Sequence, residues 1–396
     1  MKIVMIGAGI AALEAAEAIR SRCQDAEIHL FSRENVLPYR RPALTRMISQ
    51  TITDEQFFLH PETYYREKKF QLHLGIEAVS INRQHKTVFL NDGSNIGYDK
   101  LLLATGGRCF IPPIQGTELP QVITLRDKAQ LDILHEYIKN GTKNIAVIGG
   151  GLLGLEIADN LSKLDTNVTV LEACPAILPR QLDEEGAAIL VKQMNSSANV
   201  KTHYGVFISH ICGKENVEGI QTQNEQNIPC ELVIICAGLK CNIESAASAG
   251  IDVGRAIIVS EHMQTSDPDI YAAGDCTSFN NCCYGLWQPS KEQGMIAGAN
   301  IAGEPLTFNH NIYGARLNAF GTRLFSVGDI GQSDGQYQKV SSKDDLKNIY
   351  KKLFFQNRIL VGGIMLGDVA SAPKLEKAVA EHYTLEQCDN AGLVCR

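Results

Sequence analysis

The chain contains the same pattern of strand, glycine-rich segment and helix twice. In the first copy, the apolar run Ile3–Ile6 leads into Gly7–Ala12, and small apolar residues then recur at helical spacing. In the second copy, Ile145–Ile148 leads into Gly149–Gly154, again before a helical pattern. The strand-like runs that follow the two helices are Ile28–Phe31 and Val168–Leu171. Two such units predict an α/β fold with two doubly wound, Rossmann-like dinucleotide-binding domains.

Each glycine segment fits a phosphate-binding fingerprint because it follows a predicted strand and opens a predicted helix. Glycines permit the tight turn and let backbone N–H groups approach a pyrophosphate, and the helix N-terminus adds a partial positive charge. A single match could be a simple glycine turn, but two matches in the same order argue against that alternative. The residues predicted to bind phosphate are Gly7, Gly9 and Ala12 in the first segment and Gly149, Gly151 and Gly154 in the second.

The residue that ends the second strand of each unit discriminates between dinucleotides. Glu172 closes the run Val168–Leu171, and an acid there accepts hydrogen bonds from a ribose diol and repels a 2′-phosphate. We therefore expect NADH rather than NADPH in the second unit, the alternative being a solvated acid at a strand end. In the first unit the equivalent residue is Ser32, whose hydroxyl can still bond a ribose, and Glu34 is near enough to compensate.

Composition excludes several classes of protein. The 396 residues carry a net charge of -7, which argues against a nucleic-acid partner, and the longest uncharged apolar run, Ile145–Leu155, is too short to span a bilayer. The N-terminus lacks the pattern of a signal peptide, so we expect a cytoplasmic protein. Its twelve cysteines contain no C-x-x-C pair and no histidine pair has zinc spacing, so we expect plain thiols and no metal.

Breaks in the pattern indicate domain boundaries. A buried strand, Leu101–Ala104, ends in glycines, and Pro112-Pro113 then interrupts the chain. From about Leu306 onward short strand-like pieces alternate with turns before a helical tail over Ala372–His382, which predicts a small α+β domain. The predicted domains are residues 1–110 and 241–305 for the first dinucleotide-binding domain, 111–240 for the second, and 306–396 for the C-terminal domain.

Over residues 1 to 328 the chain resembles the FAD-dependent pyridine nucleotide-disulfide oxidoreductase superfamily. The resemblance rests on both fingerprints and, in order, on the segments Leu37–Arg46, Ala104–Gly106, Ala237-Gly238 and Ile270–Cys276. It implies that the first unit binds FAD and the second binds NADH, with NADPH less favoured, and that Asp275 holds the ribityl chain. The further residues assigned to cofactor binding are Ser32, Arg41, Pro42, Val79, Ala104, Thr105, Gly106, Gly238 and Gly274.

Within the superfamily the chain is similar to the rubredoxin reductase and ferredoxin reductase branch. Pro38-Tyr39, Arg41-Pro42 and Trp287 carry this likeness. In that branch the segment after Arg-Pro ends in a lysine near the flavin, whereas this chain has Arg46, which keeps the charge without the compact head group. Members that use a disulfide carry redox cysteines in the same segment, but residues 32 to 60 contain none. We therefore expect no redox-active disulfide.

Three residues are predicted to act in catalysis. Glu156 matches a family carboxylate near the nicotinamide, although packing or solvation of its helix would also explain it. Trp287 could shield the flavin or contact the nicotinamide, or could be a core residue. Arg46 keeps a positive charge in the segment where the branch has its lysine, and any role at the flavin is open. The spacing of Cys236 and Cys241 is read as coincidence, because Cys236 lies in the predicted nicotinamide domain and Cys241 at its boundary.

The resemblance implies an NADH oxidoreductase that passes electrons through FAD to a small electron-carrier protein such as rubredoxin. Three alternatives remain open: an NADH oxidase that uses oxygen, an electron-input subunit of a nitrite or nitrate reductase, and a redox-sensing flavoprotein similar to the apoptosis-inducing-factor group. No nucleic-acid or membrane partner is expected, and the protein is expected to be a monomer or homodimer. An acidic carrier could dock on the lysines at 339, 343, 347, 351 and 352, or these could form a solvated helix face.

Overall fold

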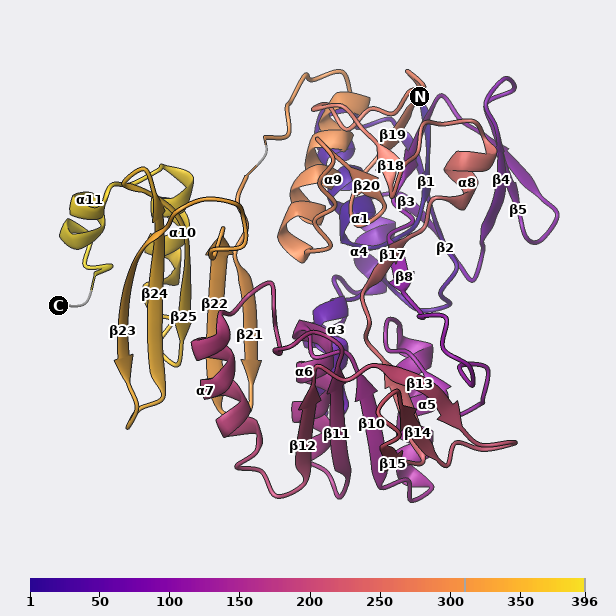
Figure 1. The fold of residues 1–396 in the computed structure, drawn as a ribbon. Coiled ribbons are helices and arrows are strands. Elements are labelled where there is room, and N and C mark those ends of the chain that lie inside the picture. The colour runs from indigo at the N-terminus through magenta and orange to yellow at the C-terminus, as the bar shows by residue number, and fades with distance from the viewer. Residues whose placement is uncertain (310, 395–396) are drawn as a thin grey trace. The chain divides into compact units, whose positions relative to one another are not determined.

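The computed structural model describes residues 1–309 and 311–394, and the chain forms two compact units (Figure 1). The first unit comprises Met1–Ala43, Thr51–Arg108 and Leu239–His310, and the second comprises Leu44–Gln50, Cys109–Gly238 and Asn311–Arg396. The segment Leu44–Gln50, which the sequence predictions place in the FAD-binding part, therefore clusters with the second unit.

A parallel five-stranded sheet organises the first unit. Its strands in spatial order are β19 (Ile270–Ala272), β7 (Lys100–Leu103), β1 (Lys2–Ile6), β2 (Glu27–Ser32) and β3 (Phe70–Leu74). The central strand is buried on both faces, as its unbroken apolar sequence predicts, and Ile6 pairs with Phe31 on one side and with Leu103 on the other. This order confirms the first doubly wound sheet.

Two helices pack very closely beside this sheet. Helix α1 (Ile10–Arg22) starts directly after the first glycine segment, and α9 (Trp287–Ile301) lies against it. A Cβ atom at Gly294 would come within 2.2 Å of the Ala11 carbonyl oxygen, and one at Gly298 within 2.3 Å of that of Ala15. The glycines of α9 and the alanines of α1 are therefore required for this contact.

The remaining elements of the first unit are short. In the antiparallel sheet β4-β5-β6, β5 and β6 pair across Asn91-Asp92-Gly93, a sequence typical of a hairpin turn. These strands are β4 (Ala78–Asn82), β5 (Thr87–Leu90) and β6 (Asn95–Gly97). The other elements are a 3-10 turn at Arg41–Ala43, α3 (Asp54–Phe57), α4 (Glu62–Glu67), α8 (Glu244–Ser248), β17 (Leu239–Cys241), β18 (Ile257–Ile258) and β20 (Thr277–Ser278), and β8 (Gly107–Cys109) where the chain passes between the units.

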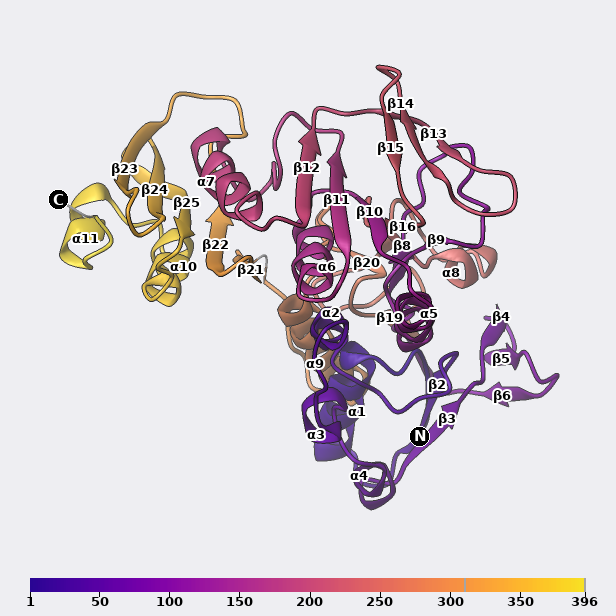
Figure 2. The same cartoon turned by 90° about the horizontal axis from the view of Figure 1, so that it is seen from below.

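The second unit contains the second parallel sheet. Its strands in order are β12 (Val200–Tyr204), β11 (Asn167–Glu172), β10 (Asn144–Ile148), β16 (Leu232–Ile235) and β9 (Val122–Ile123). Ile148 pairs with Leu171 and with Ile235, the arrangement that Ile6 has in the first unit. The accompanying elements are α2 (Leu44–Met47), α5 (Lys128–Lys139), α6 (Leu152–Ser162), α7 (Glu184–Met194), β13 (Ile208–Cys212), β14 (Gly219–Thr222) and β15 (Asn227–Pro229). Figure 2 shows α6 and α7 beside the strands β11 and β12.

The C-terminal part of the second unit is an antiparallel sheet with two helices, which confirms the predicted α+β character. The strands in order are β21 (Ala315–Ala319), β22 (Thr322–Gly328), β25 (Ile359–Leu366), β24 (Ile349–Gln356) and β23 (Gln338–Asp344), and the helices are α10 (Ala372–Ala380) and α11 (Leu385–Asn390). Phe325, Leu353, Leu360 and Leu375 belong to the buried core that joins this sheet to α10.

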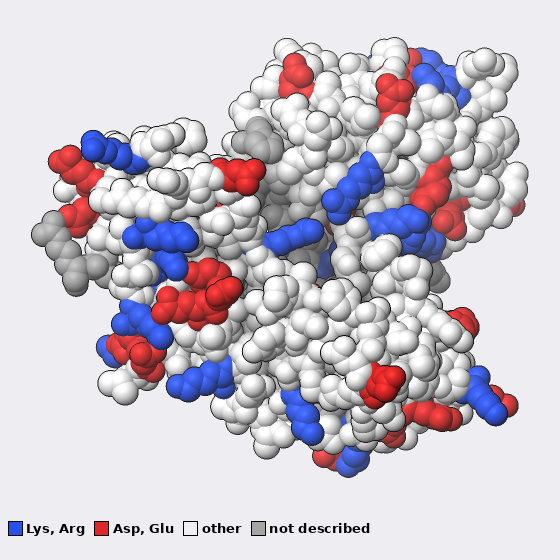
Figure 3. All heavy atoms as spheres, in the orientation of Figure 1, with Lys and Arg blue, Asp and Glu red and all other residues white. Residues whose placement is uncertain are grey.

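The predicted helix face of lysines is wrong, because these residues lie on the hairpin β23–β24. Ile349–Gln356 is rich in aromatic and β-branched residues, and its pairing with β25 overrides the helical spacing of the lysines. Lys343 approaches Glu185 and Asp345, and Lys352 contacts Asp183. Basic and acidic side chains lie interspersed on the face in Figure 3. Lys343 and Lys352 are therefore compensated by acidic neighbours.

Among the described residues, no helix combines the length and the apolar character that a membrane span needs.

Candidate functional site

The first glycine segment forms a tight turn between β1 and α1. Gly7 has φ +106, and a Cβ atom there would meet the Ala104 carbonyl oxygen at 2.1 Å, so only glycine fits. A Cβ atom at Gly9 would have no neighbour within 4 Å in the described part of the chain. Gly9 begins α1 without a side-chain cap and no acid follows in the first turn. The helix N-terminus is therefore open to an anion.

A second group of predicted residues lies at the carboxyl end of β19. Asp275 is half-buried, and one of its carboxylate oxygens accepts a hydrogen bond from the Ser290 hydroxyl at 3.1 Å. Gly274 has φ +89, and its N–H donates to Gln293 at 2.9 Å. Ser290 and Gln293 belong to α9, so this helix orients the strand end that carries Asp275. Neither Gln293 nor Ser290 was assigned a role from the sequence, because their spacing to Asp275 carries no signal.

The Arg41 side chain is held by two residues in the first unit. Its guanidinium pairs with Glu34 and lies over the Tyr39 ring, 5.2 Å from the centroid. The Tyr39 hydroxyl donates to the other Glu34 oxygen at 2.6 Å. Glu34 thus orients Arg41, a role that the sequence analysis did not assign to it.

The other predicted residues of the first unit occupy several elements. Ser32 is the last residue of β2, and the Ile76 N–H donates to its carbonyl oxygen at 2.9 Å. Val79, on β4, is 61% exposed, and Pro42 is exposed in the 3-10 turn. Ala104, Thr105 and Gly106 follow β7, and Trp287 is half-buried at the start of α9.

The second glycine segment has the same geometry in its own unit. Gly149 has φ +116, and a Cβ atom there would meet the Cys236 carbonyl oxygen at 2.5 Å. A Cβ atom at Gly154 would come within 2.0 Å of the Gly149 carbonyl oxygen, so this position must stay small for the helix to meet the strand. Gly151 starts α6 with neither a side-chain cap nor an acid in the first turn, and a Cβ there would face open space among the described residues. Gly238, with φ +120, follows β16.

Glu172 connects the second glycine segment to the chain that follows β11. Its Oε2 accepts the Gly150 N–H at 2.6 Å, and its Oε1 accepts the Cys174 N–H at 2.8 Å. Each carboxylate oxygen therefore keeps a lone pair, because an oxygen can accept more than one hydrogen bond. The acid predicted to bind a ribose diol is thus fixed next to the phosphate-binding turn.

Glu156 lies one turn into α6 and faces α2, which Figure 2 shows beside that helix. The Thr45 hydroxyl donates to Glu156 Oε2 at 3.0 Å. Burial raises the pKa of the Glu156 carboxyl, as does the charge of Asp159, whereas the Thr45 bond and the Arg46 charge lower it. Arg46 itself is exposed on α2. The structure therefore brings Glu156 and Arg46 into one electrostatic environment.

Two functional neighbours escaped the sequence analysis. Thr45 contacts Glu156, and the Ser49 hydroxyl donates to Asn160 at 2.8 Å, so residues four apart on one segment meet residues four apart on α6. Hydroxyl residues four apart, such as Thr45 and Ser49, lie on one face of a helix, but this spacing alone is a weak signal of function. It becomes informative only once the structure shows the matching pair Glu156 and Asn160 on α6.

The eleven cysteines in the described ranges are free thiols, and Cys395 lies outside those ranges. Burial raises the pKa of Cys236 and of Cys276, and it raises that of Cys241 to about 11. The Cys276 sulfur lies 3.4 Å from the carbonyl oxygens of both Leu103 and Ala273, either of which can accept its single proton. Thiols in such surroundings are poor nucleophiles. Within residues 1–309 and 311–394 no three His, Cys, Asp or Glu side chains are placed to hold a metal ion.

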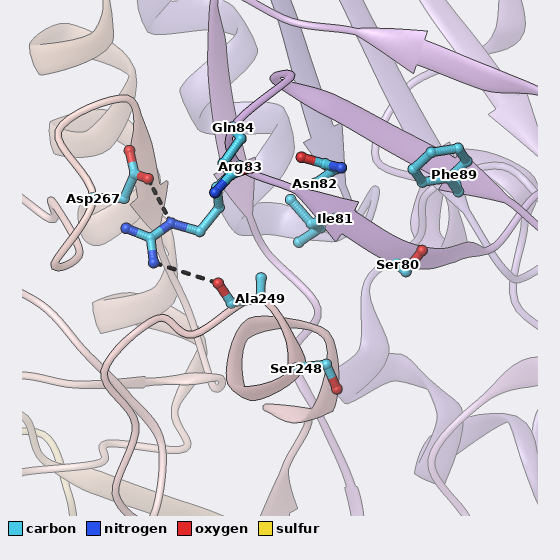
Figure 4. Close-up of a pocket in the computed structure, with 9 residues that line it drawn as sticks. All are labelled: Ser80, Ile81, Asn82, Arg83, Gln84, Phe89, Ser248, Ala249 and Asp267. Carbon is cyan, nitrogen blue, oxygen red and sulfur yellow. Dashed lines mark hydrogen bonds and ion pairs between the residues drawn. The ribbon is translucent and has the colours of Figure 1, made fainter.

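A hollow of about 740 Å³ opens on the first unit, away from the residues above (Figure 4). The side chain of Arg83 pairs with Asp267 at 2.7 Å and donates to the carbonyl oxygens of Ala249 and Gly250. Its charge is therefore compensated within the hollow. None of the residues that line it was predicted to bind or react.

Both glycine segments fit the pyrophosphate of a dinucleotide. In each segment, a glycine without a side chain (Gly9 or Gly151) leaves open space at the N-terminus of a helix. Among the described residues, no side chain caps the first N–H groups of either helix, so these groups can bind an anion. Asp275 in the first unit and Glu172 in the second each add a carboxylate, a group whose oxygens accept hydrogen bonds. Residues 1–297 match the sequence profile described as pyridine nucleotide-disulphide oxidoreductase.

The chain belongs to the pyridine nucleotide-disulphide oxidoreductase family. In this family the cofactors are FAD and NAD(P)H. Residues 315–383 match a second profile, the rubredoxin NAD+ reductase C-terminal domain, which places the chain in the rubredoxin reductase-like branch.

Three known proteins illustrate the relationship. Nitrite reductase [NAD(P)H] of Bacillus subtilis is 29% identical over 99% of this chain and 49% of its own length. Rubredoxin-NAD(+) reductase of Pseudomonas putida is 32% identical over 72% of this chain and 74% of its own. The crystal structure of NADH:rubredoxin oxidoreductase from Clostridium acetobutylicum superposes with a TM-score of 0.83 at 26% identity, covering 98% of this chain and 99% of the other. The chain thus spans about half the length of the nitrite reductase relative and most of the length of the two rubredoxin reductase relatives.

Proposed function

We propose that the protein is an NADH-dependent flavoprotein reductase that passes electrons to a small redox protein such as rubredoxin, without a redox-active disulfide. The observation that carries this proposal is the presence of two glycine cradles, each opening an uncapped helix and each accompanied by a carboxylate. FAD, when bound, accepts a hydride from NADH and releases the electrons singly or in pairs.

In the second unit, the N-terminus of α6 and the open side of Gly151 would bind the NADH pyrophosphate. Glu172 would accept hydrogen bonds from the adenosine ribose and would repel a 2′-phosphate. Glu156 would lie at the nicotinamide end, where burial raises the pKa of its carboxyl and the Thr45 hydroxyl bonds to it. This division of roles favours NADH over NADPH.

In the first unit, Gly7, Gly9 and Ala12 would bind the FAD pyrophosphate, and Arg41, oriented by Glu34, would add a positive charge. Asp275 would accept hydrogen bonds from ribityl hydroxyls while Ser290 holds its other side. Ser32, Pro42, Val79 and the segment Ala104–Gly106 remain proposed contacts of the same cofactor. Trp287, with its half-buried ring at the start of α9, would shield the reacting ring system.

Two observations support electron transfer without a redox-active thiol: the positions of the cysteines in the sequence and their surroundings in the structure. No cysteine occurs in residues 32–60, where the disulfide-using relatives of the resemblance carry theirs. The buried thiol of Cys276 lies beside two carbonyl oxygens and has a raised pKa. Electrons would therefore pass directly to an external acceptor.

A small iron-protein carrier is the acceptor that the C-terminal domain supports, because its sequence matches the rubredoxin reductase C-terminal domain. The decisive experiment is anaerobic stopped-flow spectroscopy of the purified holoenzyme. We expect NADH to bleach the visible flavin absorbance, and the reduced enzyme to return to the oxidised spectrum when mixed with rubredoxin. Ferredoxin, a flavodoxin-type protein and oxygen serve as competing acceptors in the same experiment.

Flavin that stays oxidised after NADH addition would overturn the proposal. Faster reoxidation by oxygen than by any carrier would instead identify an NADH oxidase. Slow reduction with a long-lived charge-transfer band and an NADH-dependent change of oligomeric state would identify a redox sensor.

A second candidate is the electron-input part of a nitrite-reducing enzyme. The specific observation in its favour is that 99% of this chain aligns with 49% of a nitrite reductase. Its test is co-purification from the native source with a haem or iron–sulfur protein that oxidises the NADH-reduced flavin only when nitrite or nitrate is present.

A further inference from the structure

The loop from Ala173 to Leu182 joins Glu172 to helix α7 and folds back over the second glycine segment. The Leu178 N–H donates to the Gly150 carbonyl oxygen at 3.0 Å, while the Gly150 N–H donates to Glu172. Ile177 is fully buried beside Gly150, so close that a Cβ atom on that glycine would lie 3.2 Å from it. The backbone N–H of Gly150 is thus held by Glu172, which precedes the loop, and its carbonyl oxygen is held by Leu178 within the loop.

Leu178 is held in an unfavourable conformation. Its φ is +49, in the left-handed region that a branched side chain rarely adopts, and its side chain is fully buried. Such a conformation persists only where the surroundings enforce it. Here the bond to Gly150 and the bonds from Gln181 and Leu182 to the Leu178 carbonyl oxygen enforce it. Displacement of the end of the loop would release this strain and move Gly150.

The end of the loop is attached to the C-terminal sheet. Asp183 caps α7 by accepting the Gly186 N–H on Oδ1 at 3.0 Å. Its Oδ2 accepts the Tyr350 hydroxyl at 2.8 Å and the Lys352 ammonium at 2.6 Å, both from β24. A further contact runs from the Gln332 side chain to the Pro179 carbonyl oxygen.

This attachment is buried and well matched. Tyr350 is 1% exposed, and the Lys352 and Asp183 side chains are 16% and 19% exposed. Hydrogen bonds from Lys352, Gly186 and Tyr350 outweigh burial and keep the pKa of Asp183 low, so the carboxylate stays charged. A charged group with three donors in partial burial contributes more than an exposed ion pair does.

From these contacts we infer that Tyr350 and Lys352 are positioning residues for the NADH site. By holding Asp183, the C-terminal sheet sets the end of the loop that presents Glu172 and Gly150 to the adenosine half of the dinucleotide. The C-terminal domain, which lacks a nucleotide fingerprint of its own, therefore determines how tightly NADH binds. This inference rests on the proposed function of the second unit as the NADH site.

The test uses the holoenzyme with ADP-ribose, which carries the adenosine half of NADH and cannot reduce the flavin. Calorimetric titration of Tyr350→Phe and of Lys352→Met should show binding about two- to ten-fold weaker than that of the wild type, the loss expected for one hydrogen bond. In steady state the KM for NADH should rise by a similar factor while kcat stays unchanged. In Lys352→Arg, the ADP-ribose affinity and the KM for NADH should both lie close to the wild-type values.

Two variants of the same C-terminal domain are the controls. Lys377→Met removes an ammonium that pairs with Glu381 at 3.8 Å, and Lys347→Met removes an ammonium that pairs with Asp344 at 3.7 Å. Neither residue contacts α7 or the loop through a recorded bond, so ADP-ribose should bind both controls as tightly as the wild type. If the weaker binding came only from a general loss of stability of the C-terminal domain, the controls should also bind ADP-ribose more weakly.

Three outcomes separate the possibilities. Equal ADP-ribose affinity in wild type, Tyr350→Phe and Lys352→Met would overturn the inference, even if their melting temperatures fall. Equal weakening in the two controls would also overturn it. No binding of ADP-ribose to the wild type would overturn the proposed function itself, because the NADH site would then not exist.

Discussion

The Thr45 hydroxyl donates to Oε2 of Glu156 at 3.0 Å, and this bond lowers a carboxyl pKa that burial raises. Thr45→Val removes the donor and keeps the shape of the side chain. We therefore expect the pKa of Glu156 to rise further, so that less of the carboxylate is ionised at neutral pH. The pH profile of flavin reduction by NADH should move its acid limb to higher pH in this variant, and Glu156→Gln should remove that limb.

Ser49→Ala is the control for this prediction. It removes an equivalent hydroxyl contact on the same segment, but the Ser49 partner is the amide of Asn160, which does not titrate. The acid limb should stay in place. A shift in Ser49→Ala as large as that in Thr45→Val would show that packing of α2, and not the bond to Glu156, sets the profile.

Glu172→Gln should weaken NADH binding about ten-fold or more and reduce the preference over NADPH. The variant loses the negative charge, and one of its two polar atoms becomes a donor facing the N–H of Gly150 or Cys174. Dissociation constants for both dinucleotides are measured by titration. Glu231→Gln is the matched control, since Glu231 also accepts backbone N–H groups, from Lys143 and Asn144, at the amino end of the same sheet. An unchanged NADH/NADPH preference in Glu172→Gln would contradict the role of this acid.

Two glycine substitutions should separate folding from binding. Gly149→Ala places a methyl group 2.5 Å from the Cys236 carbonyl oxygen at φ +116, so it should destabilise the protein by about 2 kcal/mol or more. Gly151→Ala places the methyl group in open space at φ -82 but makes a poorer N-cap of α6, so stability should fall by about 1 kcal/mol or less. NADH affinity should nevertheless fall, because the methyl group occupies the proposed pyrophosphate space. Normal NADH binding by Gly151→Ala would refute that placement.

His73 should make the stability of the protein depend on pH. Burial, with a smaller effect of His29, lowers the pKa of His73, whose Nε2 lies 3.1 Å from Nδ1 of His29. The unfolded chain binds a proton below a pH of about 6.5 while the folded protein resists it, so stability is lost as the pH falls from that value toward the folded pKa. In His73→Gln, chemical denaturation at several pH values should show a flatter dependence in this range. His85→Gln, at an exposed turn residue, should keep the wild-type dependence.

Local sequence determined much of the fold. The runs Ile3–Ile6 and Ile145–Ile148 are apolar on both faces, which suits only a buried parallel strand, and the glycines after them tolerate the turns that their φ values require. Both doubly wound sheets, and the acid at the end of β11, follow from such short-range rules. The prediction of a helix face of lysines was wrong, because Ile349–Gln356 forms a strand that pairs with β25. A preference for strand depends on the neighbouring strands, which a local pattern of lysines does not reveal.

By itself, then, the sequence determined the two glycine turns between strand and helix, since each turn is built within one short stretch of chain. Only the tertiary structure decided which side chains orient the acidic residues that follow these turns in the chain. Thr45 meets Glu156 across 111 positions, and Tyr350 meets Asp183 across 167. No local pattern encodes such pairs, because their hydrogen bonds form only after distant helices and strands have packed together.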